Sequence, residues 1–324
     1  MGLDVEHVVA IDIGGTKVAV GLVAFPAEGA PSVVRRVEIP TCAQEGGERV
    51  CSRIEETARE FVAGLSPEER ASLKGVGVGS AGVVDPGTGS IRYANDLMPG
   101  WGGIALGSRL EQVCGLPVAV LGDVQAHALC EALWGAGKGA GSVLCIAVGT
   151  GIGGAFVEDG KVMRGSRGAA GHMGHIASPS ASGMPCACGR TGHLECVASG
   201  TALGAVFEGR YGRVREGEPV TGKLVNELAA AGDERAVEVV REAGIALGVA
   251  AGSLTNILDP DVIVFSGGAV CGGDGWRSDV WRDAIAEGFA GEAIDPLADT
   301  PMTFASFGGD APLVGAAEFL RKSL

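Results

Sequence analysis

The sequence predicts an α/β fold built from two related halves. Apolar runs of strand length alternate with stretches in which apolar residues recur at helical spacing, as they do from Glu48 to Leu65. A hairpin whose strands flank a turn of glycine and threonine also occurs twice, once around residues 14–16 and once around residues 149–154. Alternating strands and helices are typical of α/β proteins, and the repeated hairpin indicates two halves that face each other across a cleft.

Each expected strand follows from a short apolar run, and each expected helix follows from apolar residues at helical spacing. Short apolar runs predict strands at Val8 to Asp12, Val18 to Val23, Arg35 to Ile39, Gly75 to Gly79, Pro117 to Leu121, Ser142 to Val148, Ala155 to Glu158, Val262 to Phe265 and Met302 to Ala305. Helical spacing predicts helices at Glu48 to Leu65, Ile104 to Cys114, Val124 to Trp134, Glu234 to Leu258, Gly275 to Phe289 and Leu313 to Leu324. We assign residues 1–121, joined by the closing helix at about 313–324, to a smaller lobe, and residues 122–312 to a larger lobe.

Composition limits the classes of partner. The net charge is −14, from 25 basic and 39 acidic residues, which argues against a nucleic-acid surface and, more weakly, against anionic membranes. The nine cysteines cannot all pair, and most of them stand among apolar or glycine-rich neighbours, as buried thiols do in a reducing compartment. The first residues lack a basic leader region, and no apolar run is long enough to span a membrane, so we expect a cytoplasmic protein.

Three glycine turns that directly follow strands are candidate phosphate sites. Without side chains, such turns let phosphate oxygens reach the backbone N–H groups. None of the turns has the P-loop spacing, and none is a GxGxxG motif that opens a helix, so those two nucleotide folds are disfavoured. We therefore predict a nucleotide that is held between two lobes by Asp12, Gly14, Gly15, Thr16, Lys17, Thr150, Gly151, Gly153, Gly267 and Gly268.

Four polar residues of the first half are candidate site residues, and each has two interpretations. Asp123 lies where a strand ends and a helix begins, so it is either a general base facing a cleft or the N-cap of that helix. Asp12 either orients Mg²⁺ beside the first glycine turn or is only a carboxylate at a strand end. Asn95 and Asp96 either bond sugar hydroxyls or initiate a turn.

The stretch from Gly165 to Gly200 has the composition of a metal site. It contains His175, Cys186, Cys188 and His193, a set of thiolates and imidazoles that suits tetrahedral Zn²⁺. Because all four coordination positions would be filled by protein, we expect a structural zinc ion. Cys196 remains an alternative to His193 as the fourth ligand.

At this point the residues resemble the ROK family of sugar kinases and repressors. The resemblance rests on DIGGTK at residues 12–17, GTGIGG at 149–154, the cysteine and histidine loop, and DPDVIVFSGG at 259–268, so it covers nearly the whole chain. It implies an actin-like (ribonuclease H-like) two-lobed ATPase fold with duplicated βββαβα-type halves, ATP with Mg²⁺ as cofactors, transfer to the 6-hydroxyl of a hexose, and usually a homodimer. It also implies a role for each polar candidate: Asp123 is the base, and the sugar contacts are Asn95, Glu195 and His175, to which we add Gly82, Asp96 and His172.

The chain departs from the family pattern at three positions. His172-Met173-Gly174-His175 stands where most family kinases have ExGH, and this HxGH form resembles bacterial N-acetylmannosamine kinases. Gly122 replaces the asparagine that usually precedes the base, and His193 replaces a third cysteine. Since the first hairpin begins by residue 8, we expect no DNA-binding helix-turn-helix before it.

We predict an ATP-dependent N-acylhexosamine 6-kinase acting on N-acetylmannosamine. The alternatives are a glucokinase or broad hexokinase, and a sugar sensor with weak catalysis, which the loss of the asparagine at Gly122 suggests.

Overall fold

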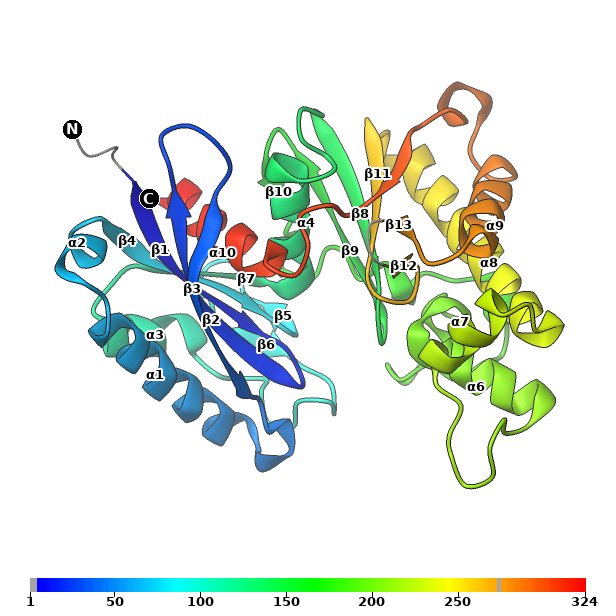
Figure 1. The fold of residues 1–324 in the computed structure, drawn as a ribbon, viewed down its shortest axis with the longest axis horizontal. Helices are drawn as coiled ribbons and strands as arrows, with labels where there is room; N and C mark the ends of the chain where they lie inside the picture. The colour runs from blue at the N-terminus through cyan, green and yellow to red at the C-terminus, as the bar shows by residue number, and fades with distance from the viewer. Residues whose placement is uncertain (1–4, 273–274) are drawn as a thin grey trace. The chain divides into compact units, whose positions relative to one another are not determined.

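The computed structural model of the chain describes residues 5–272 and 275–324, and it divides into two compact units. Unit 1 consists of the described residues of Met1–Lys138 with Gly160–Ala170 and Phe307–Leu324, and unit 2 consists of Gly139–Asp159 and the described residues of Gly171–Ser306. Unit 1 contains a sheet with the order β3-β2-β1-β4-β7, and the strands of unit 2 form a sheet with the order β9-β8-β11-β14 (Figure 1). The orders β2-β1-β4-β7 and β9-β8-β11-β14 correspond strand by strand, which confirms the predicted duplication and the actin-like fold class.

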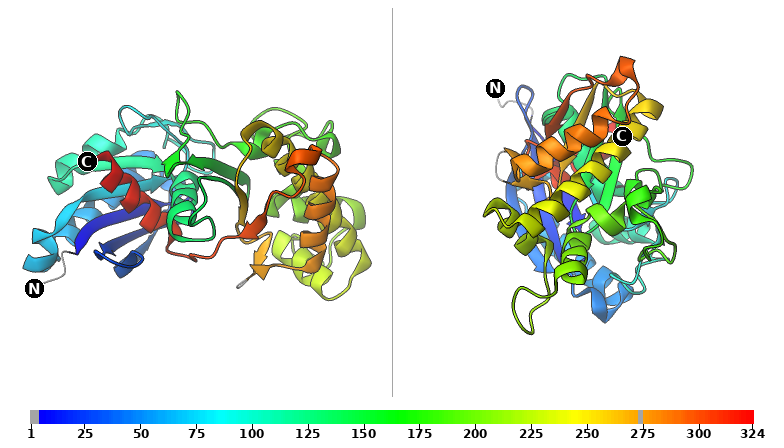
Figure 2. Two further views of the ribbon diagram at one scale, coloured as in Figure 1. Left: turned by 90° about the horizontal axis from the view of Figure 1, so that it is seen from above. Right: turned by 90° about the vertical axis from the view of Figure 1, so that its right-hand side faces the viewer.

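The sheet of unit 1 is covered on both faces. Strands β1 (Glu6–Ile13), β2 (Lys17–Phe25) and β3 (Ser32–Pro40) are antiparallel neighbours, whereas β4 (Leu73–Ser80) and β7 (Val118–Gly122) run parallel to β1. Residues Val9, Ile11 and Ile13 of β1 pack toward helices α1 (Gly47–Ala63) and α3 (Leu106–Cys114), and the alternate residues Val8 and Ala10 pack toward α10 (Ala311–Ser323) (Figures 1 and 2). The parallel strands therefore read as continuous apolar runs because both of their faces are buried.

Unit 2 repeats the arrangement and adds more helices. Strand β8 (Ser142–Val148) pairs antiparallel with β9 (Ile152–Glu158) and parallel with β11 (Val262–Ser266), which pairs in parallel with β14 (Met302–Phe304). The long helix α8 (Glu234–Leu258) lies alongside α9 (Asp279–Ala290), as Figure 2 shows in yellow and orange. Small residues allow this close approach, since a Cβ on Gly248 would lie 2.1 Å from the carbonyl oxygen of Ile285.

The remaining elements complete the two units. They are α2 (Pro67–Ala71), α4 (Asp123–Trp134), α5 (Glu195–Ala198), α6 (Gly200–Tyr211), α7 (Gly222–Ala230), β5 (Val83–Val84), β6 (Ile91–Tyr93), β10 (Lys161–Val162), β12 (Cys271–Gly272), β13 (Gly275–Trp276), and the 3₁₀ turns η1 (Ala43–Glu45), η2 (Met173–His175), η3 (Pro179–Ala181) and η4 (Asp295–Leu297). Among the described residues, no helix combines the length and the apolar composition that crossing a membrane requires.

The structure differs from the sequence prediction in several places. The helix predicted from Gly275 begins at Asp279, because the Ser278 hydroxyl caps it by accepting the Trp281 N–H, and residues 275–276 form strand β13 instead. Helices α6 and α7 were not predicted. Helix α4, which we assigned to the larger lobe, belongs to unit 1 because it packs on α10.

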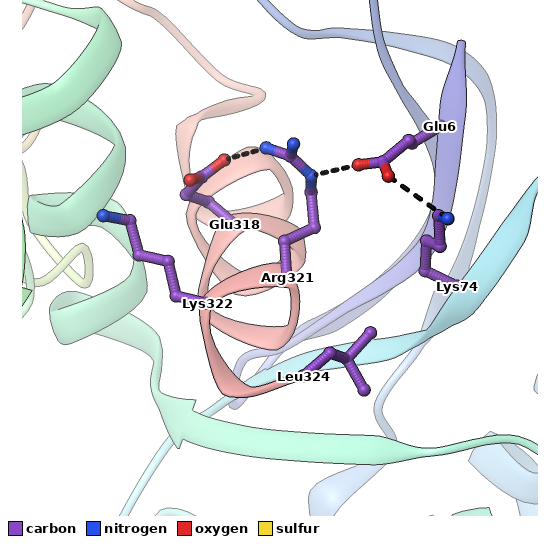
Figure 3. A pocket seen from close by; sticks show the side chains of 6 residues that line it. All are labelled: Glu6, Lys74, Glu318, Arg321, Lys322 and Leu324. Atoms are coloured by element: carbon purple, nitrogen blue, oxygen red, sulfur yellow. Dashed lines mark hydrogen bonds and ion pairs between the residues drawn. The ribbon is translucent and has the colours of Figure 1, made fainter. Parts of the chain in front are cut away.

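A network of ion pairs attaches the C-terminal helix to the first strands of unit 1. Figure 3 shows Arg321 between two carboxylates, with its Nε 3.0 Å from Glu6 and an Nη 2.9 Å from Glu318. The Lys74 ammonium lies 3.2 Å from the other oxygen of Glu6. These residues line a surface hollow of about 470 Å³ in which every acidic side chain has a basic partner. The arrangement holds β1, β4 and α10 together.

Glycines allow helix α10 to touch the backbones of its neighbours: Gly77 of β4 lies against Ala316, and Gly315 of α10 lies against Ala126. Gly315 provides a test of this packing. A Cβ on Gly315 would lie 1.7 Å from the Ala126 carbonyl oxygen of α4. We expect Gly315→Ala to destabilise the protein by about 1–3 kcal/mol through overpacking, measured as a lower melting temperature. Gly309→Ala is the matched control, because a Cβ there meets nothing within 4 Å. Equal melting temperatures of the two variants would contradict this account of the α4–α10 contact.

Candidate active site

Two aspartates stand at one edge of the sheet of unit 1, where three parallel strands end. Asp12 of β1 pairs with Gly79 of β4, and Gly79 pairs with Leu121 of β7, so the ends of the three strands are level. A Cβ on Gly79 would lie 3.8 Å from Asp12 Oδ1 and 3.6 Å from the Cα of Asp123. The two aspartates therefore flank β4 at the carboxyl edge of the sheet, where open α/β sheets bind their ligands.

The environment of Asp12 suits a cation. Burial raises the pKa of the Asp12 carboxyl to about 7, and the negative charge of Asp123 adds to this rise. A divalent cation beside the carboxylate would compensate both effects. Oxygen ligands from carboxylates are what Mg²⁺ prefers, so the donors present here fit that ion.

Asp123 is the first residue of helix α4 and not its cap. The N-cap is Gly122, whose N–H is directed to the side-chain oxygen of Gln125 at 3.3 Å, so the N-cap interpretation of Asp123 is wrong. One carboxylate oxygen of Asp123 accepts the N–H of Val124 at 2.8 Å. A carboxylate in the first turn is stabilised in its charged form by the helix dipole.

The first glycine turn exposes its backbone. The Gly14 N–H donates to the Lys17 carbonyl at 3.0 Å, which closes the hairpin, and the Thr41 hydroxyl donates to the Gly14 carbonyl at 2.7 Å. Gly15 and Thr16 are exposed, and the ammonium of Lys17 lies 3.1 Å from Glu38 at the surface. The tip is open to a ligand, as a phosphate turn requires.

The residues of unit 1 that were predicted to contact the sugar lie at two places. Asn95 and Asp96 lie in a turn, and Gly82 lies where two backbone segments are close together. Asn95 Oδ1 accepts the Leu97 N–H at 3.2 Å, which is the turn-forming role that was one of its two interpretations, and Asp96 is exposed in the same turn. Gly82 has φ +93°, and a Cβ there would lie 2.6 Å from the Tyr93 carbonyl, so this position requires glycine. Trp101 is fully buried, and its indole donates to Ser80 Oγ, so it packs and does not stack on a ligand.

In unit 2 a pocket of about 550 Å³ lies at two of the glycine turns. The Gly200 N–H donates to the Gly149 carbonyl, and the Ala269 N–H donates to the Val148 carbonyl, so three chain segments meet here. Gly267 has φ +91°, and a Cβ would lie 2.3 Å from the Val148 carbonyl, which only glycine allows. The lining residues are Gly149, Thr150, Gly200, Thr201, Val220, Thr221, Gly222, Lys223, Asn226, Gly268, Ala269 and Arg277.

Two helix N-termini contribute to this pocket, and neither was predicted from the sequence. Helix α6 begins at Gly200, where the Ser199 hydroxyl accepts the Ala202 N–H, and α7 begins at Gly222, where Thr221 caps in the same way. Free N–H groups at such termini favour anions. The repeated signal, a hydroxyl cap followed by glycine, was present in the sequence but lies outside the glycine turns that directly follow strands. It adds Thr221, Lys223, Asn226 and Arg277 to the candidate residues.

The four predicted metal ligands come together in unit 2. Their ligand atoms all lie within 4.8 Å of one another, with Cys186 Sγ 3.6 Å from His175 Nδ1 and Cys188 Sγ 3.3 Å from His193 Nδ1. Tetrahedral zinc with ordinary Zn–S and Zn–N bonds places such atoms about 3.6 Å apart, so the set fits zinc. The alternative ligand, Cys196, directs its thiol to the Pro185 carbonyl at 3.5 Å.

The metal cluster is linked to the second glycine turn. Glu195 follows His193 by two residues, and its carboxylate accepts the Ile152 N–H at 2.9 Å. A Cβ on Gly151 would lie 2.4 Å from the same carboxylate oxygen. The ring of His172 stands 6.1 Å from that of His175 at an interplanar angle of 17°. A metal that holds His175 and His193 would thus also hold His172, Glu195 and this turn in place.

Comparison with known proteins agrees with this architecture. The sequence model of the ROK family matches residues 8–323. Glucokinase from Halalkalibacterium halodurans is 32% identical over 97% of this chain and 94% of its own length. N-acetylmannosamine kinase from Escherichia fergusonii is also 32% identical, over 95% of this chain and 96% of its own length. A ROK family glucokinase from Streptomyces griseus, solved in complex with glucose and AMPPNP, is 30% identical, with a TM-score of 0.75 over 98% of this chain and 99% of that one.

The chain belongs to the ROK family, and within it to the ATP-dependent sugar kinases. Glucokinases match it more strongly than N-acetylmannosamine kinases do, so the comparisons favour the glucokinase alternative over the N-acetylmannosamine kinase that we predicted.

Proposed function

We propose that this protein transfers the γ-phosphoryl group of ATP to the 6-hydroxyl of a hexose, with glucose as its preferred substrate. The observation that carries the proposal is the full-length similarity to glucokinases, one of them solved with glucose and an ATP analogue. The carboxylate of Asp123 at the carboxyl edge of the first sheet supports it, since a base is needed at the attacking hydroxyl.

In this mechanism Asp123 accepts the proton of the 6-hydroxyl while the hydroxyl oxygen attacks the γ-phosphorus. A P–O bond to the sugar forms, the bond to the β-phosphate oxygen breaks, and ADP leaves with the electron pair. Little other covalent chemistry is required of the protein, so most of the acceleration comes from positioning and from stabilising charge.

The glycine turns and helix N-termini supply that charge stabilisation. We assign ATP to the pocket of unit 2, where its phosphates would meet the turns at Thr150 and Gly268 and the two helix N-termini, which favour anions. The turn at Gly14 in unit 1 remains a predicted phosphate turn. Mg²⁺, when bound, neutralises charge on the β- and γ-phosphates, and Asp12 would hold it. Asn95, His175 and Glu195, with Gly82, Asp96 and His172, would contact the sugar.

We assign the cluster of His175, Cys186, Cys188 and His193 to structural zinc. All four positions are filled by protein, so the ion would have no site for substrate and would serve to order the loop. The homodimer and the cytoplasmic location remain predictions.

A second candidate substrate is N-acetylmannosamine, and one observation favours it. His172 occupies the position at which most family kinases carry glutamate, and its ring lies beside His175. An imidazole and a carboxylate at the same place would offer different hydrogen bonds to the substituent on the sugar's second carbon. This single position would therefore separate the two substrates.

Steady-state kinetics with three sugars tests the proposal. We expect kcat/KM for glucose to exceed those for N-acetylglucosamine and N-acetylmannosamine by about tenfold or more, because a polar site that fits one sugar leaves unpaired groups around another. ADP release coupled to NADH oxidation is the measurement. A higher value for N-acetylmannosamine would contradict the preference and support the second candidate. Sugar binding without ADP release would contradict the kinase itself and support a sensor.

A further inference from the structure

A buried chain of hydrogen bonds supports one wall of the pocket in unit 2. The indole N–H of Trp281 on α9 donates to Asn226 Oδ1 at 2.8 Å, and Asn226 Nδ2 donates to the Ala269 carbonyl at 3.2 Å. An indole only donates and a carbonyl only accepts, so these two partners fix the orientation of the Asn226 amide. A flipped amide would place like groups against each other at both ends.

The three residues joined by these hydrogen bonds are buried. Trp281 is 0% exposed, Asn226 is 5% exposed and Ala269 is 6% exposed. Hydrogen bonds in such surroundings do not compete with solvent, and the loss of one leaves a buried polar group without a partner. The bonds therefore join helices α7 and α9 rigidly to the segment 267–269.

Segment 267–269 contains the glycine turn that follows strand β11, and the hydrogen bonds from Asn226 and Trp281 restrict its conformation. The Ala269 N–H donates to the Val148 carbonyl at 3.0 Å, and the Ala269 carbonyl accepts from Asn226, so both polar groups of this residue are occupied. Gly267 has a positive φ and lies against Val148, because a Cβ there would be 2.3 Å from the Val148 carbonyl oxygen. A Cβ on Gly268 would meet nothing within 4 Å, which leaves the face of this residue open to the pocket that it lines.

We propose that Asn226 is a positioning residue for the phosphoryl donor: through Ala269 it holds the turn at Gly268 in the shape that receives a nucleoside triphosphate. This proposal rests on the assignment of ATP to this pocket. Asn226 has no share in proton transfer or in sugar binding. Its removal should weaken the binding of ATP and leave the affinity for sugar unchanged.

Asn226→Asp tests the proposal with almost no change in shape. The carboxylate still accepts from Trp281, but it faces the Ala269 carbonyl with a second acceptor where a donor stood. We expect KM for ATP and the Kd for AMPPNP to rise about tenfold, with kcat and the KM for sugar within about threefold of the wild type. Trp281→Phe removes the other end of the chain, and we expect it to raise the same Kd by a smaller factor.

A matched control is available in the same unit. Asn256 Nδ2 donates to the Glu292 carbonyl at 3.0 Å, so Asn256→Asp breaks the same kind of bond at an exposed place that does not line the pocket. This variant should keep the Kd for AMPPNP of the wild type.

The binding experiment also separates this proposal from the proposed function. The calorimetric Kd for AMPPNP needs no turnover, so a protein that binds AMPPNP but phosphorylates no sugar would refute the kinase assignment and still test Asn226. An unchanged Kd in Asn226→Asp with a wild-type melting temperature would overturn the positioning role. If Asn226→Asp does not fold, Trp281→Phe decides, and an unchanged Kd in that variant overturns the proposal.

Discussion

Asp123→Asn should lower kcat by about 10²–10⁴-fold, the range that general-base catalysis contributes, while glucose still binds. The amide has nearly the same size and keeps an oxygen that can accept the Val124 N–H, so helix α4 should remain intact. It cannot take the proton of the 6-hydroxyl. The measurements are kcat from ADP release and the Kd for glucose by calorimetry.

Asp279→Asn is the control for this substitution. Asp279, like Asp123, is the first residue of a helix, so both substitutions remove a charge that the helix dipole favours. Asp279 belongs to an exposed ion pair with Arg282 and does not line the pocket of unit 2. We expect Asp279→Asn to keep the kcat of the wild type. Near-normal turnover by Asp123→Asn would remove Asp123 from its proposed role.

Removal of zinc should give the second large effect. We expect about one Zn²⁺ per chain by elemental analysis, and after chelation a rise in the KM for sugar of about 10–100-fold, the range typical when the support of a ligand shell is lost. The reason is geometric. The metal would hold His175, whose ring lies beside His172, and His193, which is two residues from Glu195.

Return of Zn²⁺, and not of Mg²⁺, should restore the affinity for sugar. Cys186→Ser should reproduce the chelated state, whereas Cys114→Ser, at a half-buried thiol of unit 1, should not. A metal-free protein with an unaltered KM for sugar would refute the structural role of zinc.

The parts of the fold that were predictable from the sequence share a local cause. Strand β8 and helix α8 have the predicted bounds because their apolar periodicity begins and ends at capping or turn residues. The duplication was visible because both copies keep the glycines that their hairpin tips require. The metal set was visible because its four ligands lie within 19 residues of sequence, from His175 to His193.

Other features were missed. Helix α6 carries almost no separation of apolar and polar faces, because neighbours cover it on several sides. Helix α7 has an apolar face and a capping threonine, and this local signal was overlooked. The preference between the two sugars depends on where the His172 side chain lies relative to a bound substrate. The identity of the residue at position 172 does not determine that position. The similarity of the HxGH motif to one subgroup therefore led to N-acetylmannosamine, while the chain as a whole is more similar to glucokinases.

By itself, then, the sequence determined the α/β class, the repeated glycine hairpins and the clustering of His175, Cys186, Cys188 and His193, since each depends on residues that are close along the chain. Tertiary structure alone decided that Asp12 and Asp123 flank Gly79, and that burial, with the nearby charge of Asp123, raises the pKa of Asp12. It alone joined Trp281, Asn226 and Ala269 into one buried chain of hydrogen bonds. The physical reason is that burial and hydrogen-bond partners are properties of neighbours in space, and these residues are separated in the sequence by whole strands and helices.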